Sequence, residues 1–168
     1  MKKQFAILSF LAFGLFAAFD ANGQNYNSAI GARLGSPLAL SYKKFISEGN
    51  AIELYGAFRN FSNYNWFSIN GAYQVHRDFP NVENLQWYLG GGAGLFFWSF
   101  DDGIFGPGVD EPSSTTVAIS GYLGLEYTFD DVPLSLSVDW VPTFFLSGYD
   151  DGFSAGYGAL AARYVIGK

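Results

Sequence analysis

The stretch Thr116–Phe129 reads TVAISGYLGLEYTF and alternates between two kinds of side chain. One series, beginning at Val117, is mostly large and apolar; the other is small or polar and contains Ser120 and Glu126. A period of two residues predicts a β-strand with one apolar face. At roughly 3.3 Å per residue and a tilt near 40°, the strand would extend about 30 Å or more along a barrel axis, beyond the ~25 Å apolar band of an outer-membrane barrel. Strands of globular proteins are usually much shorter, so this length indicates a membrane-crossing strand.

The beginning of the chain has the three parts of a secretory signal. Two lysines precede an apolar run at residues 5–18, and residues 21–23 (Ala-Asn-Gly) form a small-residue cleavage site. The apolar run is too short to cross a membrane as a helix. We therefore expect residues 1–23 to be removed as a signal peptide and residues 24–168 to form one barrel domain.

The composition favours a membrane protein over a soluble domain. Aromatic residues make up 20% of the chain and charged residues only 14%, whereas soluble domains have about 25% charged residues. The sequence contains no cysteine, which excludes disulfide bonds and a lipid anchor on cysteine. A formal net charge of −6 gives no basic surface for nucleic acid. We expect neither a nucleic-acid partner nor a cofactor.

The same alternation continues through the chain after residue 25. It predicts eight strands, at residues 27–35, 38–46, 51–60, 65–76, 85–99, 116–129, 133–141 and 153–166. Turns and loops separate these strands, and no segment outside the leader has a helical period. The pattern therefore predicts an all-β fold, an eight-stranded antiparallel up-and-down transmembrane β-barrel.

Phe96 and Trp98 are exceptions to the alternation. They fall in the small and polar series of the fifth predicted strand, after the glycine run 90–92. A β-bulge in this run would shift the phase and turn both rings outward, and this is the interpretation that we favour. If both rings point inward, they form with Phe144 and Phe145 the rim of a site for a small apolar ligand.

Two opposite barrels fit eight such strands. A lipocalin-like soluble barrel places its apolar series inside, and a membrane barrel places it against lipid. The interior of an eight-stranded barrel barely holds side chains, so the bulky apolar series does not fit there. The charges within the strands agree, because seven of the eight fall in the small series, away from lipid. The predicted lumen contains Arg33, Lys43, Glu53, Arg59, Glu126, Asp139 and Arg163.

These charges must be paired inside the lumen, because an unpaired buried charge is costly. Hairpin geometry places Lys43 opposite Glu53 and Glu126 opposite Ser135, with Arg163 one strand further on. One hypothesis is a salt-bridged plug that blocks a continuous pore. The simpler interpretation, which we favour, is that the charges only hold the barrel together.

Loop lengths predict the orientation. Short turns at 47–50 and 130–132 would face the periplasm with both termini, and longer loops at 100–114 and 147–152 would face the exterior. In this frame the outward aromatic residues fall at two levels, as in the aromatic girdles of membrane barrels. The periplasmic level contains Tyr42, Tyr73, Trp87, Tyr127 and Tyr164, and the outer level contains Phe58, Phe67, Phe97 and Trp140.

Several motifs resemble the small outer-membrane β-barrel proteins common in Bacteroidota. They are ARLGSPL at 32–38, SYKKF at 41–45, LQWYLG at 85–90, GLEYTF at 124–129 and LSVDW at 136–140. More broadly, the chain is similar to OmpA/OmpX-type eight-stranded barrels. The resemblance implies an outer-membrane location, contact with lipid and lipopolysaccharide, insertion by the barrel assembly machinery and a monomeric state. The resemblance gives hardly any indication of a specific activity.

Catalysis and metal binding are weaker alternatives. Barrels of this size that modify lipid A need a histidine beside a serine or an acid near the outer leaflet, whereas His76, the only histidine, is expected at the periplasmic end. Acidic side chains in the outer loops could gather a divalent ion, but we expect solvated surface and no metal site. These acids are Asp101, Asp102, Asp110, Glu111, Asp150 and Asp151.

We therefore expect an integral outer-membrane barrel with a narrow, charge-plugged lumen in a Gram-negative envelope. Its role would be structural, adhesive or envelope-maintaining, without catalytic activity. The alternative is a narrow, porin-like channel or a binding barrel for small apolar molecules, which inward-facing Phe96 and Trp98 would favour. A lipid A-modifying barrel enzyme is the remote alternative.

Overall fold

The computed structural model describes residues 26–60, 64–100, 114–147 and 152–167. These residues form ten strands: β1 (Ser28–Ser36), β2 (Leu38–Ser47), β3 (Asn50–Asn60), β4 (Tyr64–Asp78), β5 (Leu85–Phe100), β6 (Ser114–Thr128), β7 (Leu134–Trp140), β8 (Thr143–Ser147), β9 (Gly152–Ser154) and β10 (Gly158–Gly167). Among the described residues, no helix has the length and apolar character needed to span a membrane. The expected signal peptide and the acidic loop residues lie outside the described ranges.

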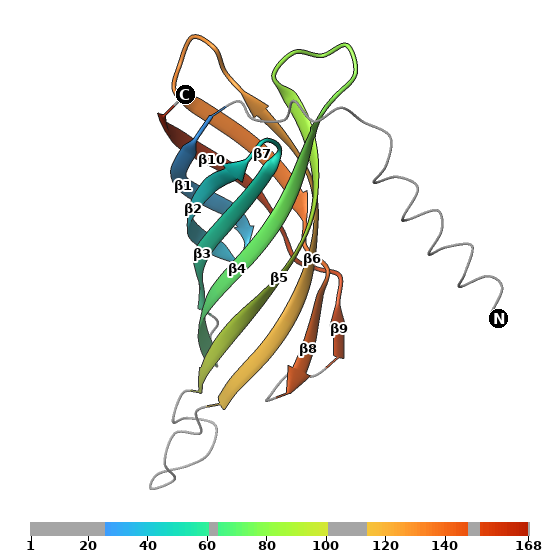
Figure 1. Cartoon of the computed structure of the whole chain (residues 1–168). Coiled ribbons are helices and arrows are strands. Elements are labelled where there is room, and N and C mark those ends of the chain that lie inside the picture. The colour runs from blue at the N-terminus through green and yellow to red at the C-terminus, as the bar shows by residue number, and fades with distance from the viewer. Residues whose placement is uncertain (1–25, 61–63, 101–113, 148–151, 168) are drawn as a thin grey trace, which may run out of the picture.

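The strands form one antiparallel sheet that closes on itself (Figure 1). Its order is β5-β4-β3-β2-β1-β10-β7-β6, and β6 pairs with β5 to complete the ring. β8 continues the course of β7 along β6, and β9 pairs with β8. The predicted eight-stranded up-and-down barrel is therefore confirmed, with its seventh and eighth strands each built from two segments.

The two interruptions were not predicted. The seventh strand breaks at Val141 and Pro142 and resumes as β8, so it runs well beyond the predicted end at residue 141. Pro142 has no N–H to donate to a ladder, and its carbonyl oxygen accepts a hydrogen bond from the N–H of Gly121 at 2.9 Å. The eighth strand breaks at residues 155–157, between β9 and β10.

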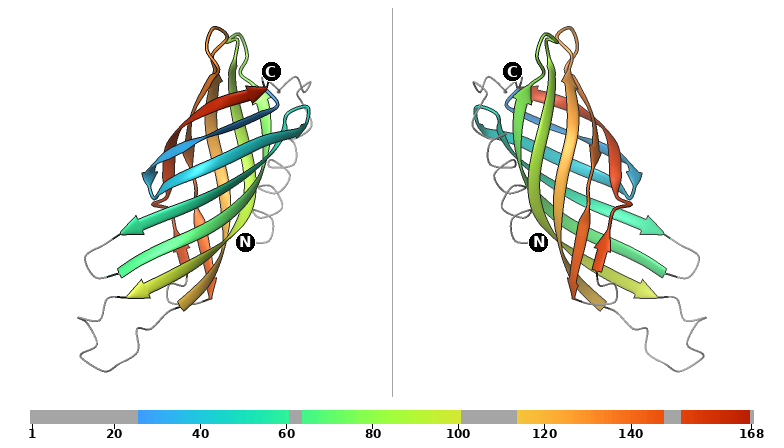
Figure 2. Two further views of the ribbon diagram at one scale, coloured as in Figure 1. Left: turned by 90° about the vertical axis from the view of Figure 1, so that its left-hand side faces the viewer. Right: turned by 90° about the vertical axis from the view of Figure 1, so that its right-hand side faces the viewer.

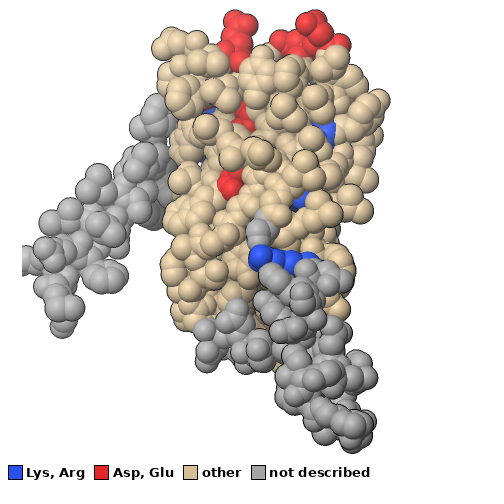
Figure 3. All heavy atoms as spheres, turned by 180° about the vertical axis from the view of Figure 1, so that it is seen from behind, with Lys and Arg blue, Asp and Glu red and all other residues tan. Residues whose placement is uncertain are grey.

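The barrel has two distinct ends. We call the turn end the one with the connections 48–49, 79–84 and 129–133 and with the described chain ends Tyr26 and Gly167; the opposite end is the loop end (Figure 1). Figure 3 shows a wall made almost entirely of uncharged residues, with acidic side chains gathered at the turn end. The exposed acids in or beside these connections are Glu48, Asp78, Glu83, Asp130 and Asp131.

The alternation along each strand determines which side chains form the outer wall of the barrel and which point into the lumen. Leu40 and Leu54 point outward and are 75% and 55% exposed, whereas Glu53 and Arg163 point inward and have no exposed surface. An exposed apolar wall of this extent is what a bilayer would cover.

The structure places some of the outward aromatic residues side by side on the wall. Phe58, Phe67 and Phe97 are register neighbours on β3, β4 and β5, and the last two rings stack at 6.4 Å. Trp140 lies apart from this row, because it pairs with Leu123, whose partner on β5 is eight residues from Phe97. Toward the turn end, Trp87 is half-buried and four tyrosines are exposed: Tyr42, Tyr73, Tyr127 and Tyr164.

The predicted bulge in β5 is wrong. Pairing with β4 and with β6 is continuous through the glycine run 90–92, and Phe96 and Trp98 point inward, 6% and 4% exposed. The inward glycines provide clearance instead of a bend. A Cβ on Gly92 would lie 3.1 Å from the ring of Tyr122, which crosses the lumen there.

The predicted register of the β2–β3 hairpin is confirmed, and that of the β6–β7 hairpin is wrong by two residues. Lys43 pairs with Glu53, as expected. Glu126 pairs with Ser137 instead of Ser135. The turn is longer than predicted, because β6 ends at Thr128 and β7 begins only at Leu134. The shift is two residues, so every side chain keeps its predicted face.

Gly124 leaves room for an aromatic ring on the neighbouring strand. Tyr88 is its register partner, and a Cβ at Gly124 would lie 2.4 Å from Cζ of that ring. We expect Gly124→Ala to displace Tyr88 and to lower the free energy of unfolding by about 1–3 kcal/mol. Urea titration in phospholipid vesicles measures this loss. Gly121→Ala is the control, because its Cβ would meet Pro142 at an ordinary 3.5 Å.

Candidate functional site: the charged interior of the barrel

Six of the seven predicted lumen charges lie together in the barrel interior. They come from six different strands, and each is at most 5% exposed. Three are basic and three acidic, so their formal charges cancel. We call this set the charge cluster: Arg33, Lys43, Glu53, Glu126, Asp139 and Arg163.

Glu53 binds two arginines that lie far apart in the sequence, Arg33 on β1 and Arg163 on β10. Its Oε1 accepts hydrogen bonds from Nη1 of Arg33 at 3.0 Å and from Nη2 of Arg163 at 2.5 Å. Its Oε2 accepts from Nε2 of Gln74 at 2.8 Å. One carboxylate on β3 thus ties together β1, β4 and β10, with every partner buried.

Asp139 holds the other side of the Arg33 guanidinium. Both carboxylate oxygens lie 2.8 Å from Nη2 of Arg33, and Oδ2 also accepts from the hydroxyl of Tyr88 at 2.7 Å. The guanidinium lies 4.7 Å from the ring centroid of Tyr55, within cation–π distance. Arg33 therefore has two carboxylate partners and little attraction left for another anion.

Glu126 is the acidic centre nearest the turn end. Nζ of Lys43 lies 2.8 Å from its Oε2, and the hydroxyl of Tyr26 donates to its Oε1 at 2.6 Å. The hydroxyl of Ser135 donates to the same oxygen, although the register separates the two residues. Lys43 therefore forms its ion pair across the lumen, and not with its register partner Glu53.

Arg59 is the predicted lumen charge that does not join the cluster. It lies near the loop end of β3 and pairs in register with Trp66. The uncharged members of the network, such as Gln74 and Tyr88, were not predicted. Their only signal in the sequence was their position in the inward series.

His76 lies beside the charge cluster. Its Nδ1 is 3.8 Å from Oε2 of Glu126, and its ring packs between Phe45 and Tyr88 at centroid distances of 4.9 and 4.7 Å. The pair contains a base and an acid, but neither side chain has exposed surface that a substrate could reach. The described ranges contain no cluster of three metal-ligating His, Cys, Asp or Glu side chains.

Tyr26 precedes β1 and anchors the start of the barrel to Glu126. Burial raises the pKa of its phenol well above the ordinary value, so the hydroxyl stays protonated and donates. Because a hydrogen bond to a buried carboxylate contributes more than a neutral one, we expect Tyr26→Phe to lower the free energy of unfolding by about 1.5–3 kcal/mol. Urea titration measures the loss, with outward Tyr127→Phe as the matched control. Equal effects of the two substitutions would contradict the assignment.

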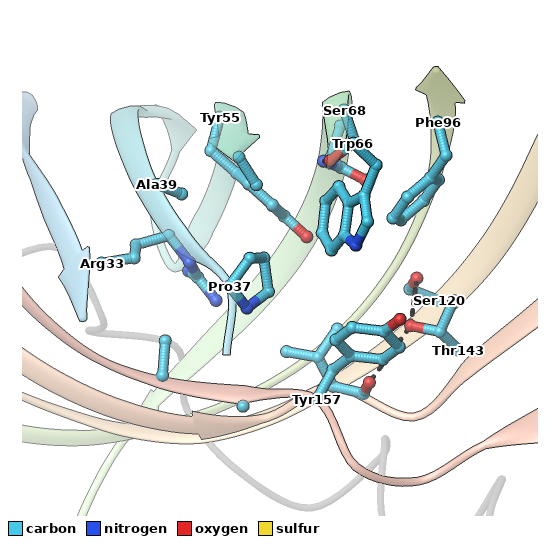
Figure 4. A pocket seen from close by; sticks show the side chains of 15 residues that line it. Arg33, Pro37, Ala39, Tyr55, Trp66, Ser68, Phe96, Ser120, Thr143 and Tyr157 are labelled. Carbon is cyan, nitrogen blue, oxygen red and sulfur yellow. Dashed lines mark hydrogen bonds between the residues drawn. The ribbon is translucent and has the colours of Figure 1, made fainter. Parts of the chain in front are cut away.

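The lumen toward the loop end is aromatic instead of charged. Trp66, Phe96, Trp98 and Phe145 form one buried cluster, and the indole N–H of Trp98 donates to the hydroxyl of Thr116 at 3.0 Å. Between this aromatic cluster and Arg33 lies a cavity of about 30 Å³ (Figure 4). The two residues predicted as a possible ligand rim therefore line the interior, Phe96 at the cavity itself.

Comparisons with known proteins place the fold but give no family. No protein-family model matches the sequence, and no curated protein sequence matches it. The crystal structure of Neisserial surface protein A (NspA), an outer-membrane eight-stranded β-barrel, is similar with a TM-score of 0.62. The match covers 83% of this chain and 93% of NspA at 14% identity. At this identity the similarity shows the fold alone, that of a transmembrane β-barrel.

Proposed function

We propose that this chain is an integral outer-membrane protein whose lumen is plugged by the charge cluster. Its role is structural, adhesive or envelope-maintaining and does not involve catalysis. The observation that carries the proposal is the cluster itself: six paired, inaccessible charges inside a barrel whose outer wall is apolar.

The ion pairs that span the lumen oppose the passage of ions through the barrel. An ion that crosses must separate at least one buried ion pair, and removing one partner of such a pair costs about 3–5 kcal/mol. The formal charges of the cluster cancel, so no net charge attracts a permeating ion of either sign. Ring side chains of Tyr55, Tyr88 and Tyr122 fill the space between the ion pairs.

The expected leader and the apolar wall support export and insertion into the outer membrane. In this orientation the turn end faces the periplasm and the loop end faces the exterior. The wall contacts lipid and lipopolysaccharide, the barrel assembly machinery inserts the chain, and the barrel is monomeric. The similarity to NspA, an outer-membrane protein, supports the same compartment.

Cysteine labelling tests location and orientation together, because the native chain has no cysteine. In a Gram-negative host, a cysteine at Asp102 should react with an impermeant maleimide on intact cells. A cysteine at Asp131, in the β6–β7 turn, should react only after the outer membrane is permeabilised. Labelling of Asp131→Cys on intact cells would contradict the orientation, and recovery of the protein in the soluble periplasmic fraction would contradict the location.

A second candidate function is binding of a small apolar molecule. The inward positions of Phe96 and Trp98 favour it, because both rings join Trp66 and Phe145 in the buried aromatic cluster beside the cavity. The cavity beside Phe96 gives this candidate a place in the fold.

A further inference from the structure

The cavity lies in the lumen between two layers of side chains. The charge cluster is its floor, through Arg33, and the aromatic cluster with Trp66 and Phe96 lies toward the loop end. Figure 4 shows side chains from both sides of the barrel converging on it. A molecule reaching this space along the barrel axis would have to displace one of these two layers.

Among the described residues, the strands beside the cavity end at different distances from the loop end. The β1–β2 hairpin turns at Pro37, so β2 begins at Leu38, opposite Phe58, and β3 extends beyond it to Asn60. Among the described strands, β9 pairs with β8 alone. Figure 2 shows that the β1–β2 turn stops well short of the loop end. We call this shortened part of the wall, between β3 and β9, the notch.

The cavity reaches the wall at the notch. Its lining includes Pro37 at the β1–β2 turn and Tyr157, Gly158 and Ala159 where β10 begins. Ser36 is paired with Gly158, so the last rung of the β1–β10 ladder borders the notch on the side of the turn end. Residues at the notch, Tyr157 among them, therefore form part of the cavity lining.

The side chains that line the cavity favour an uncharged aromatic ligand. Trp66, Phe96 and Tyr157 offer aromatic edges and faces, on which planar molecules pack well. Ser120 and Thr143 add hydroxyls, which share a 2.9 Å hydrogen bond. The one charge in the lining, Arg33, is already neutralised by two carboxylates. An anionic ligand would therefore gain little and would lose its hydration.

Tyr157 limits the size of the present cavity. A volume of about 30 Å³ holds roughly two water molecules, less than one aromatic ring needs. Tyr157 belongs to the connection 155–157 between β9 and β10, and its ring packs edge-on against Phe145 at 6.1 Å. Its carbonyl oxygen accepts from the N–H of Val141 at 2.9 Å, so the backbone is held and any enlargement of the cavity here would come from rotation of the Tyr157 side chain.

We propose that the notch is a lateral entrance from the bilayer to a binding site for small, neutral, single-ring aromatic molecules, and that the Tyr157 side chain is its gate. This inference rests on the proposed function, because lateral entry requires the wall to be embedded in lipid. It adds a ligand class, a route and a gating residue to the second candidate function.

Photolabelling in lipid nanodiscs tests the entrance. The probe is 3-trifluoromethyl-3-phenyldiazirine, a neutral single-ring compound that dissolves in bilayers, and adducts are located by peptide mass spectrometry. We expect adducts on cavity residues such as Ser120 and Thr143, and suppression of these adducts by excess toluene. Tyr157→Ala should raise cavity labelling severalfold, whereas Tyr164→Ala, an outward tyrosine on the same chain segment, should leave it unchanged.

A cavity-filling variant and a membrane-impermeant probe test the binding site and the lateral route separately. Ala57→Leu places extra volume in the cavity and should lower its labelling about tenfold, the equivalent of about 1.4 kcal/mol in binding. A sulfonated, membrane-impermeant ring probe should not label the cavity; if it does, entry is from water and the lateral route is wrong. Equal cavity labelling in wild type, Tyr157→Ala and Ala57→Leu would also overturn the inference.

Outward residues report separately on the proposed function. Leu54 and Ile69 face away from the lumen and should be labelled in every variant. If they are labelled and the cavity is not, the barrel lies in the bilayer and only the entrance is refuted. If they too remain unlabelled, the membrane location itself is wrong.

Discussion

Glu53→Gln should lower the free energy of unfolding by about 3–5 kcal/mol, the cost of removing one partner of a buried ion pair. The substitution keeps the shape of the side chain but leaves Arg33 and Arg163 with one carboxylate fewer between them. Asp139 still compensates Arg33, so Arg163 carries most of the loss. Reversible urea unfolding in phospholipid vesicles, followed by tryptophan fluorescence, measures the effect.

Glu48→Gln is the matched control for this measurement. Glu48 lies in the exposed β2–β3 turn, five residues before Glu53, and the same change of charge there should cost less than about 0.5 kcal/mol. Equal losses in the two variants would show that net charge, and not the buried pairing, determines the stability.

The Lys43–Glu126 pair should show strong energetic coupling. Lys43→Met leaves Glu126 buried without its cation, and Glu126→Gln leaves Lys43 buried without its anion, so each should cost about 3–5 kcal/mol. The double variant removes both charges and should cost less than the sum by about 1–3 kcal/mol. The same urea titrations of all four proteins complete the cycle.

Lys44→Met provides the control for the lysine. Lys44 is the next residue on β2 and is exposed, so the loss of its charge should change stability by less than about 0.5 kcal/mol. Additive effects of Lys43→Met and Glu126→Gln would mean that the 2.8 Å contact contributes nothing to stability.

The faces of the barrel could be predicted because alternation is a local property. Whether a residue such as Glu53 or Leu54 points inward depends only on its parity along the strand, and a two-residue shift in a hairpin leaves parity unchanged. The same rule placed Phe96 and Trp98 on the inward series. The predicted bulge rests on the conflict between large rings and a series of small residues, and the small buried neighbours Ala39, Ala57 and Ala118 leave room for these rings.

The partners inside the lumen could not be predicted in the same way. Lys43 pairs in register with Glu53 yet forms its ion pair with Glu126, because a long side chain crosses the narrow lumen to another strand. Such contacts depend on barrel diameter and strand tilt, which no single hairpin specifies. The break at Pro142 is a further example, since a proline alone does not reveal that the strand resumes.

The comparison with NspA illustrates how loosely sequence constrains this architecture. At 14% identity the two chains still share the barrel over most of their lengths. Alternation needs only the right class of side chain at each position, so the fold persists when residues change. The lumen is where identity matters, because the pairing of Glu53, Glu126 and Asp139 requires particular partners.

Planar-bilayer recording of the purified protein tests the central claim most directly. If the charge cluster closes the lumen, wild-type barrels should insert without steady conductance in 1 M KCl. The Lys43→Ala/Glu126→Ala double variant, which removes one ion pair and its volume, should show intermittent openings. Steady conductance from the wild-type protein, at the same level as the double variant, would contradict the account.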